Sequence, residues 1–461
     1  MPFTTVARRK FMIFAAMSAV AGGCKSVPEP PIITATPETA EIERQLPLRP
    51  WVPPAEVMPG ETGIPPKLDI LTMREAVSRA VSFSPALKGA FAEVEARRAD
   101  AAQASYRPNP ELGIQIENVA GSKSKVGLNN AESTLALSQV IELGDKRIKR
   151  LVASNFDTTA AAWDYEVARV QIASEAASLF VDVLASSERL TALHEFAAVA
   201  AEIENGVKTR VEGGKGNPID LDRAMVSTAR IQALVRSEKA RFEAARTKLS
   251  AMWGDKNPSF AKASGQLGQA RIVPELAAIR AYLESNPQLA RWRDEVGRRY
   301  AAVILEQAKA VPDLTVGAGV RQFNEDNSTA LVASVSVPLK IFDGNQGNIE
   351  AAQRRIAKAE FDTENARSEM YRALADAIGD LAAADAQVST FEGKILPAAK
   401  EAFAKTRTGY QEGRFDFLNV LDTERVLFEL RLEAINARAD YERARVKAEA
   451  LIGKRLSDVK R

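Results

Sequence analysis

The chain contains two related halves, and this duplication limits the folds open to it more than any other feature. "SFSPALKG" at 82–89 has its counterpart in "ESNPQLAR" at 284–291, and "RPNPELGIQI" at 107–116 in "AVPDLTVGAG" at 310–319. Matching landmarks keep their order at offsets of 202 or 199 positions: Pro85 with Pro287, Leu87 with Leu289, Pro110 with Pro312, Leu112 with Leu314, and Gly214 with Gly413. One plan used twice indicates a repeat architecture.

Each half reads as a helix, a β-hairpin, one very long helix, a break and a closing helix. Thr72 and Glu75 have the spacing of a capping box, which predicts that the first helix covers 72–105. The prolines that follow end it. Further helices are expected at 146–211, 218–252, 275–309 and 346–409, with a last one ending near 451.

The predicted lengths favour a tube over a compact domain. A helix over 146–211 would be about 100 Å long at 1.5 Å per residue. The helices at 218–252 and 275–309, stacked end to end, would match it, so each half is expected to be one long helix beside two shorter ones. The segment 254–274 between them, with its glycines and a proline, is expected to be an irregular connector.

Two hairpins, 112–141 and 313–340, carry the pattern of membrane strands. In the second, apolar residues alternate with Gly, Ser, Thr and Arg, the pattern of strands with one face in lipid and one in a lumen. Four strands cannot close a barrel, so several chains must contribute. The alternative is a soluble hairpin packed on its own helices.

The first 24 residues predict export and a lipid anchor. Arg8, Arg9 and Lys10 precede the apolar run Phe11–Ala21, which is too short to span a bilayer, and Cys24 follows. The stretch resembles a bacterial lipoprotein signal, in which the cysteine becomes the lipidated first residue of the mature chain. The alternative is an ordinary signal peptide with an incidental cysteine. Eleven of the 22 prolines lie within 25–66, which predicts an extended arm.

Charge and ligand chemistry exclude several function classes. The chain has 62 Lys and Arg against 60 Asp and Glu, and loss of residues 1–23 would leave 59 against 60. This balance provides no electrostatic footprint for nucleic acid. His194 is the only histidine and Cys24 the only cysteine, so no metal site, cofactor or catalytic centre is expected. "GGKG" at 213–216 lacks the residues of a phosphate loop and reads as a turn between helices.

The duplicated plan, "SQVIELGDKR" at 138–147 and "SVPLKIFDGNQGNI" at 336–349 together resemble the TolC family of outer-membrane efflux channels over about 68–455. The two motifs look most like its cobalt-zinc-cadmium branch. The resemblance implies a homotrimer that builds a twelve-stranded barrel in outer-membrane lipid and a helical tunnel through the periplasm. It also implies two partners, a periplasmic adaptor (membrane fusion) protein and an inner-membrane RND-type pump. The expected division is signal peptide 1–23, arm 24–67, repeats 68–253 and 275–455, connector 254–274 and tail 456–461.

The resemblance also suggests an aperture at the paired helix tips, "GGKGNPIDLD" at 213–222 and "EGRFDFLNVLD" at 412–422. Asp220, Asp222, Asp416 and Asp422 are the candidate aperture residues, since a ring of carboxylates attracts cations. The alternative is that they are solvated carboxylates favoured by the helix dipole. Gly214 and Gly413 are expected to serve the turns through positive φ.

Three questions stay open at this stage. The first is class: the chain could instead be a periplasmic adaptor, or a coiled-coil lipoprotein that transports nothing. The second is the substrate, heavy-metal cations or drugs and other small molecules. The third is topology, where the connectors 121–130 and 322–329 are expected to face the cell exterior because barrels place their longer loops outside.

Overall fold

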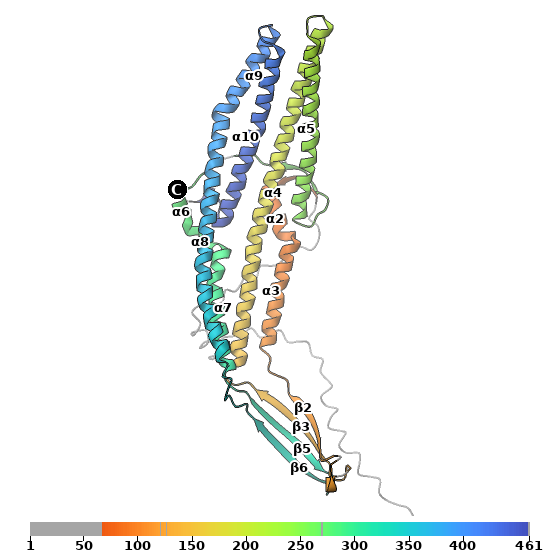
Figure 1. Ribbon diagram of the computed structural model, residues 1–461, viewed down its shortest axis with the longest axis vertical. Coiled ribbons are helices and arrows are strands. Elements are labelled where there is room, and N and C mark those ends of the chain that lie inside the picture. The colour runs from red at the N-terminus through yellow and green to blue at the C-terminus, as the bar shows by residue number, and fades with distance from the viewer. Residues whose placement is uncertain (1–66, 120, 126, 269–270, 460–461) are drawn as a thin grey trace, which may run out of the picture.

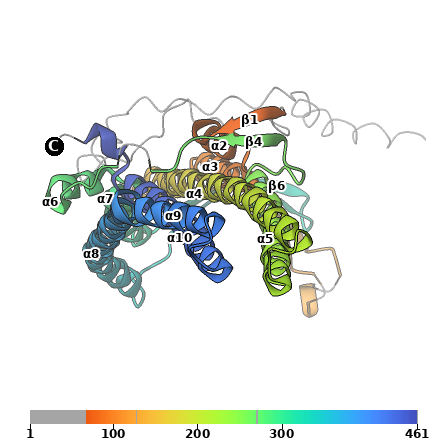
Figure 2. The same ribbon diagram turned by 90° about the horizontal axis from the view of Figure 1, so that it is seen from above.

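A computed structural model describes residues 67–119, 121–125, 127–268 and 271–459. The protein is elongated, with paired helix tips at one end and a four-stranded sheet at the other (Figure 1). Seen along the long axis, the helices form a curved row instead of a closed bundle (Figure 2). The signal peptide, Cys24 and nearly all of the arm lie outside the described residues.

The first repeat begins with strand β1 (Leu68–Thr72), followed by α2 (Met73–Phe83) and α3 (Pro85–Ala104). The capping box is confirmed: the Thr72 amide donates to Glu75 Oε2 at 2.9 Å, and the Glu75 amide to Thr72 Oγ1 at 3.3 Å. The single helix expected over 72–105 is wrong, because it breaks at Ser84. Proline at 85 disfavours helical ψ in the preceding residue, and Ser84 has ψ 124°.

The long helix of this repeat is confirmed as α4 (Lys146–Glu212), whose 67 residues extend about 100 Å. It is followed by α5 (Pro218–Ala251). Both α3 and α5 pack on α4, α3 beside its half near the sheet and α5 beside its half near the tips (Figure 1). The expected stacking of 218–252 on 275–309 is therefore wrong, because α3 takes that position in the first repeat.

The second repeat follows the same plan with α7 (Pro287–Lys309), α8 (Gln346–Thr390), α9 (Leu396–Gln411) and α10 (Phe417–Ile452). A π-helical turn, Phe391–Ile395, joins α8 to α9. Pro397 is the second residue of α9, and a proline cannot donate to the carbonyl four residues earlier, so the wider turn accommodates the missing hydrogen bond. The continuous helix expected over 346–409 thus keeps its length with one irregular turn.

The helix expected over 275–309 is shorter than predicted. Only α6 (Leu276–Ile279) and the 3₁₀ turn Arg280–Ser285 precede α7. Asn286 caps α7 by accepting from the Gln288 amide at 2.9 Å, and its Nδ2 donates to the carbonyls of Ala450 and Leu451 at 3.0 and 2.9 Å. A buried asparagine held this way fixes the break against α10.

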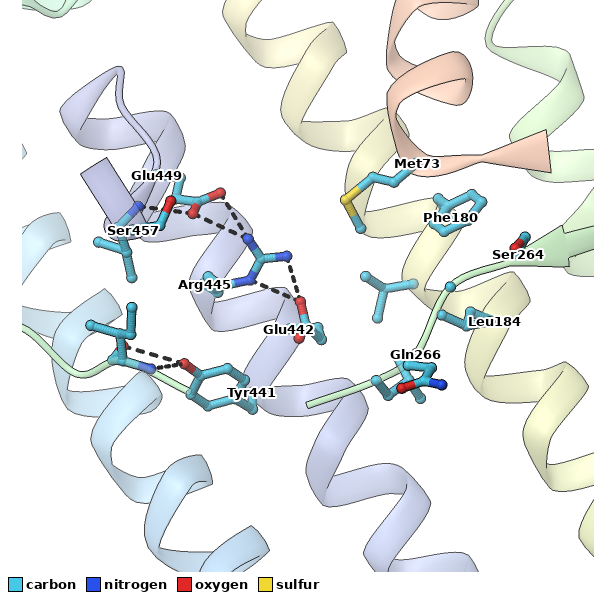
Figure 3. Close-up of a pocket in the computed structure, with 15 residues that line it drawn as sticks. Met73, Phe180, Leu184, Ser264, Gln266, Tyr441, Glu442, Arg445, Glu449 and Ser457 are labelled. Carbon is cyan, nitrogen blue, oxygen red and sulfur yellow. Dashed lines mark hydrogen bonds and ion pairs between the residues drawn. The ribbon is translucent and has the colours of Figure 1, made fainter. Parts of the chain in front are cut away.

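The connector 254–274 is more regular than expected. It contains β4 (Phe260–Ser264), which pairs in parallel with β1. Further along, the connector lies against α10, where Tyr441 Oη accepts from the Ile272 amide at 2.7 Å and donates to its carbonyl at 3.2 Å. Beside this contact is a cavity of about 370 Å³, which Met73, Phe180 and Arg445 help to line (Figure 3).

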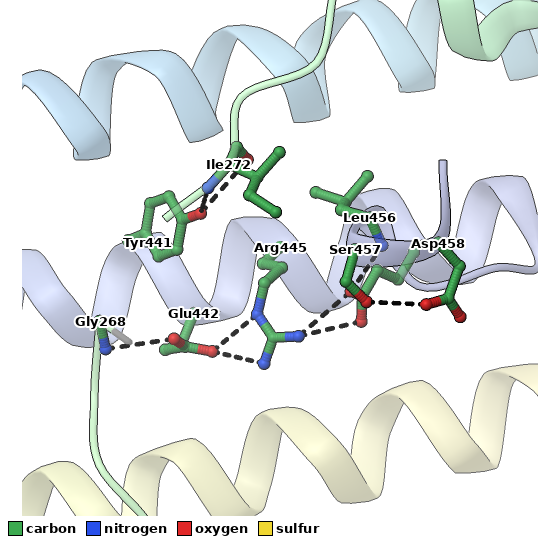
Figure 4. Close-up of polar contacts among 9 residues, drawn as sticks. Gly268, Ile272, Tyr441, Glu442, Arg445, Leu456, Ser457 and Asp458 are labelled. Atoms are coloured by element: carbon green, nitrogen blue, oxygen red, sulfur yellow. Dashed lines mark hydrogen bonds and ion pairs between the residues drawn. The ribbon is translucent and has the colours of Figure 1, made fainter. Parts of the chain in front are cut away.

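An ion triad on α10, with Glu442 buried and Arg445 and Glu449 half-buried, fastens the connector and the end of the chain. Arg445 pairs with Glu442 at 2.6 Å and Glu449 at 3.1 Å. Glu442 also accepts from the Gly268 amide at 3.2 Å, and Glu449 from the Leu456 amide at 3.0 Å (Figure 4). The triad therefore holds the connector and the end of the chain against α10, and each of its charged groups has a partner of opposite charge.

The two hairpins join into one antiparallel sheet in the order β2 (Glu111–Glu117), β3 (Glu132–Ile141), β5 (Leu314–Phe323) and β6 (Ser328–Ser336). The four expected strands are thus confirmed. β3 and β5 belong to different repeats, so the sheet unites the two halves. Within the described residues, no helix is both long and apolar enough to cross a bilayer.

The turns that lead from sheet to helix are alike in both repeats. "ELGD" and "FDGN" each end in a residue with left-handed backbone, Asp145 at φ 57° and Asn345 at φ 64°, immediately before α4 and α8. Asp313 pairs with Lys146 at 2.6 Å and accepts from the Leu143 amide at 3.0 Å. The two motifs that carried the family resemblance therefore both form the turn from a strand into the long helix of their repeat.

Candidate functional site

The helix tips form the first candidate site, at the end of the molecule farthest from the sheet. α4 and α5 are joined by a turn in which Gly214 has φ 72°, and α9 and α10 by a turn in which Gly413 has φ 76°. Side chains with a Cβ rarely adopt such values, and each turn must reverse the chain within a few residues. Both glycines thus have the conformation expected of a turn glycine.

The two tips pack against each other through α4 and α9. The Arg210 guanidinium lies 4.8 Å from the ring centre of Tyr410, and its Nη1 donates to the Tyr410 carbonyl at 3.3 Å. Phe417 packs on the same ring at 5.5 Å between centres. Burial raises the pKa of Tyr410, so this phenol stays neutral. Val207 and Val420 complete a small apolar core that joins the tips.

The four candidate aspartates lie at the starts of α5 and α10. Asp220 is partly buried and lies 3.6 Å from Arg223, while Asp222 is exposed. Asp416 is the exposed N-cap residue of α10, and its carboxylate makes no capping hydrogen bond. Asp422 is exposed and pairs with Arg425 at 3.1 Å.

The structure thus gives two of these aspartates an arginine three residues later on the same helix. Exposed pairs of this kind contribute little stability, but they reduce the negative potential near the tip. No hydrogen bond or ion pair joins the α5 aspartates to the α10 aspartates within the described part of one chain. A ring of these groups would require several chains.

A buried carboxylate near the tips was not found from the sequence. Glu424 on α10 is 4% exposed, and its Oε1 has no hydrogen-bond partner among the described residues. Burial raises its pKa to about 7. Its burial could have been predicted from helical spacing. Val420, Glu424 and Leu427 are spaced by four and three residues, so Glu424 occupies a position in the apolar stripe of the helix.

The sheet forms the second candidate site. The register aligns one residue of every strand in a single row, Ile114, Leu135, Val320 and Leu331, with exposures of 71%, 50%, 48% and 89%. The opposite face carries mainly small and polar side chains, together with Val140, Phe323 and Val332. β2 and β6 each pair with one strand only among the described residues, so the sheet has two open edges. An exposed apolar face and open strand edges mark surfaces that are covered in the assembled protein, the edges by further strands.

Metal-ligand chemistry is sparse in the described residues. They contain no group of three or more His, Cys, Asp or Glu side chains that could hold a metal ion. His194 is exposed on α4. Cys24 lies outside the described residues.

Comparison with known proteins identifies the architecture. Residues 76–255 and 278–454 match the outer membrane efflux protein family. The cobalt-zinc-cadmium resistance protein CzcC of Cupriavidus metallidurans is 32% identical over 386 residues, which cover 83% of this chain and 90% of that protein. The nickel and cobalt resistance protein CnrC of the same organism is 31% identical over 309 residues, which cover 67% and 73%.

Solved structures agree on the fold. A crystal structure of CusC, described in terms of transmembrane channel formation, superimposes with a TM-score of 0.69 and 17% identity, over 83% of this chain and 92% of that one. A membrane protein from Pseudomonas aeruginosa gives a TM-score of 0.72 and 16% identity, over 89% and 98%. The two halves of the family match correspond to the two repeats of the fold.

Proposed function

The chain belongs to the outer membrane efflux protein family, and from this premise we propose that three copies assemble into one continuous conduit through the outer membrane and the periplasm. The curved row of helices in each copy supplies about a third of a tube wall (Figure 2). Each sheet supplies four strands of a twelve-stranded barrel. The open edges of β2 and β6 pair between neighbouring copies, which removes both edges.

The observation that carries this proposal is the exposed apolar row of the sheet. In water, four large apolar side chains in one row would be an aggregation hazard. In a bilayer the same row faces lipid, and the polar face lines the lumen.

We propose divalent heavy-metal cations as the substrate, delivered by an inner-membrane RND-type pump and a periplasmic adaptor protein. The support is the identity of 32% and 31% to proteins named for cobalt-zinc-cadmium and for nickel-cobalt resistance. A conduit needs no tailored metal site, because conduction requires weak binding. Drugs and other small molecules are the second candidate, and transport assays on whole cells with each class of substrate separate the two.

We propose that Cys24 is the lipidated first residue of the mature chain. The support is the small-residue run before a sole cysteine and the proline-rich arm after it. Lys25 follows in place of the aspartate that signals inner-membrane retention in enteric bacteria, so an outer-membrane destination is expected. The anchor would then assist the barrel in holding the protein in that membrane.

We propose that the paired tips form the periplasmic aperture and that Asp220, Asp222, Asp416 and Asp422 make it attractive to cations. Three copies of the tip around a narrow axis would multiply the potential of each carboxylate. The arginines beside Asp220 and Asp422 would weaken this ring. Gly214 and Gly413 would act through the backbone of the tip turns alone.

Adjacent residues on opposite faces of β3 provide the experiment. Leu137 lies on the apolar face and Ser138 on the polar face, one position apart. Leu137→Lys should abolish the heat-modifiable trimer in the outer membrane, because a lysine facing the bilayer midplane costs about 2–4 kcal/mol in each chain. Ser138→Lys, the matched control, should leave the trimer intact. Equal effects of the two variants would contradict a barrel with this orientation.

A further inference from the structure

The polar face of the sheet changes in character along the strands. Toward the helices its rows carry mostly small residues, with Gly113, Ala136 and Gly319 side by side, and Glu111 at the start of β2 is the exception. A Cβ at Gly319 would lie 2.5 Å from the Leu135 carbonyl oxygen, so the strand needs glycine there. Toward the loops the rows carry long side chains. The lumen of the proposed barrel is therefore lined most densely at its outer end.

Arg321 on β5 contacts side chains of two other strands in these outer rows. Its Nε donates to Thr134 Oγ1 at 2.8 Å, and its Nη1 lies 2.9 Å from Glu132 Oε2, both on β3. Its Nη2 lies 3.1 Å from Glu117 Oε2 on β2. All three guanidinium nitrogens are used, which matches the rigid fork geometry that distinguishes arginine from lysine.

The second carboxylate oxygen of Glu132 has its own partner. Asn118 Nδ2 donates to Glu132 Oε1 at 2.7 Å, and Lys125 Nζ donates to Asn118 Oδ1 at 2.5 Å. The outer rows thus combine two carboxylates with two cations from one chain, and Arg321 is the cation in direct contact with both carboxylates. The single positive charge of Arg321 therefore offsets half of the negative charge of the two carboxylates that it contacts.

We propose that Arg321 is a built-in counter-ion of the channel exit, which keeps Glu117 and Glu132 from retaining divalent cations that leave the cell. The inference rests on the proposed function, because it requires three copies around a lumen. Without Arg321, six carboxylates would face the exit, and carboxylate oxygens are strong ligands of divalent cations. A conduit for such ions works only if each site along it releases them. Arg321 is thus a selectivity-determining residue at the outer end.

Two substitutions separate this role from simple strand cross-linking. Arg321→Lys keeps the charge and loses the three-pronged geometry, whereas Arg321→Gln keeps hydrogen-bonding capacity and loses the charge. If Arg321 acts as a counter-ion, the lysine variant should have the ion selectivity and Zn²⁺ block of the wild type, and the glutamine variant should differ in both. A purely structural role requires that both variants lose trimer stability in similar measure.

The experiment measures single-channel currents of the purified full-length trimer in planar bilayers, with Zn²⁺ added on the loop side. Arg321→Gln should be blocked at a Zn²⁺ concentration at least tenfold lower than the wild type, and its reversal potential should shift toward cation selectivity. The double variant Glu117→Gln with Glu132→Gln should shift toward anions and resist block. Arg354→Gln, an exposed arginine on α8, is the matched control and should change neither quantity.

The outcomes are distinct. If Arg321→Gln conducts with wild-type selectivity and wild-type Zn²⁺ block, the inference is overturned. If Arg321→Gln does not assemble, the test rests on the double variant Glu117→Gln with Glu132→Gln. Unchanged ion selectivity in that variant would also overturn the inference. If the wild-type protein itself gives no channels, the failure is that of the proposed function.

Discussion

Glu424 should make the packing of the helix tips depend on pH. Its carboxyl is buried on α10 between the apolar core of the tips and the larger core of the helices. Burial alone raises the pKa from 4.5 to about 7, and no neighbouring charge contributes. The ionised carboxylate of Glu424 therefore destabilises the packed state of the tips, and any motion that exposes this side chain to water removes the destabilisation.

The magnitude follows from the shift. A rise of roughly 2.5 pH units at about 1.4 kcal/mol per unit gives about 3 kcal/mol per chain. The group binds its proton more tightly in the packed state than in the open one. The penalty is therefore absent below about pH 4.5, grows as the pH rises through the interval to about 7, and is constant above it. Acidic pH should favour packed tips, and neutral pH should loosen them.

Glu424→Gln tests this reasoning, because glutamine imitates the protonated carboxyl. Hydrogen exchange of the α10 amides near the tip, measured from pH 5 to 8 and corrected for intrinsic exchange rates, should show protection that falls with pH in the wild type. In the variant, protection should stay high. Glu429→Gln on the same helix, an exposed side chain near Arg230, is the matched control. Equal pH dependence in the wild type and Glu424→Gln would refute the argument.

Three further predictions concern the remaining sites. Asp220→Asn with Asp422→Asn should weaken cation selectivity and divalent block in planar bilayers; unchanged values would remove both aspartates from the constriction. Mass spectrometry should find an acylated Cys24 at the mature N-terminus, and Cys24→Ala should abolish the modification, whereas an unmodified start at another residue would end the lipoprotein proposal. Asn327→Cys, in a background without Cys24, should react with an impermeant maleimide on whole cells, and protection there would contradict an exterior position for 322–329.

The architecture could be predicted because its determinants are repeated and periodic. The offset of about 200 residues revealed the duplication, and alternation over 314–321 revealed a strand that the structure confirms as β5. The length of α4 followed from an uninterrupted alanine-rich stretch. Such signals extend over many residues, so local irregularities do not hide them.

The errors arose where one residue overrides a pattern or where contacts are distant in sequence. The break at Ser84 depends on a single proline, and the late start of the helix expected over 275–309 depends on the capping and bridging by Asn286. The pairing of β1 with β4 joins residues 192 positions apart, such as Leu68 and Phe260, which no local pattern specifies. The buried state of Glu424 was readable from helical spacing, but its lack of a partner required the structure.

The central claim is that three chains form one conduit with a shared barrel. Cryo-electron microscopy of the full-length protein extracted from the outer membrane tests it most directly. The account predicts three chains around one axis, with β6 of each chain paired to β2 of the next and the apolar row of Leu135 and Val320 turned toward the detergent. A particle with another number of chains, or with each four-stranded sheet folded separately against its own helices, would contradict it.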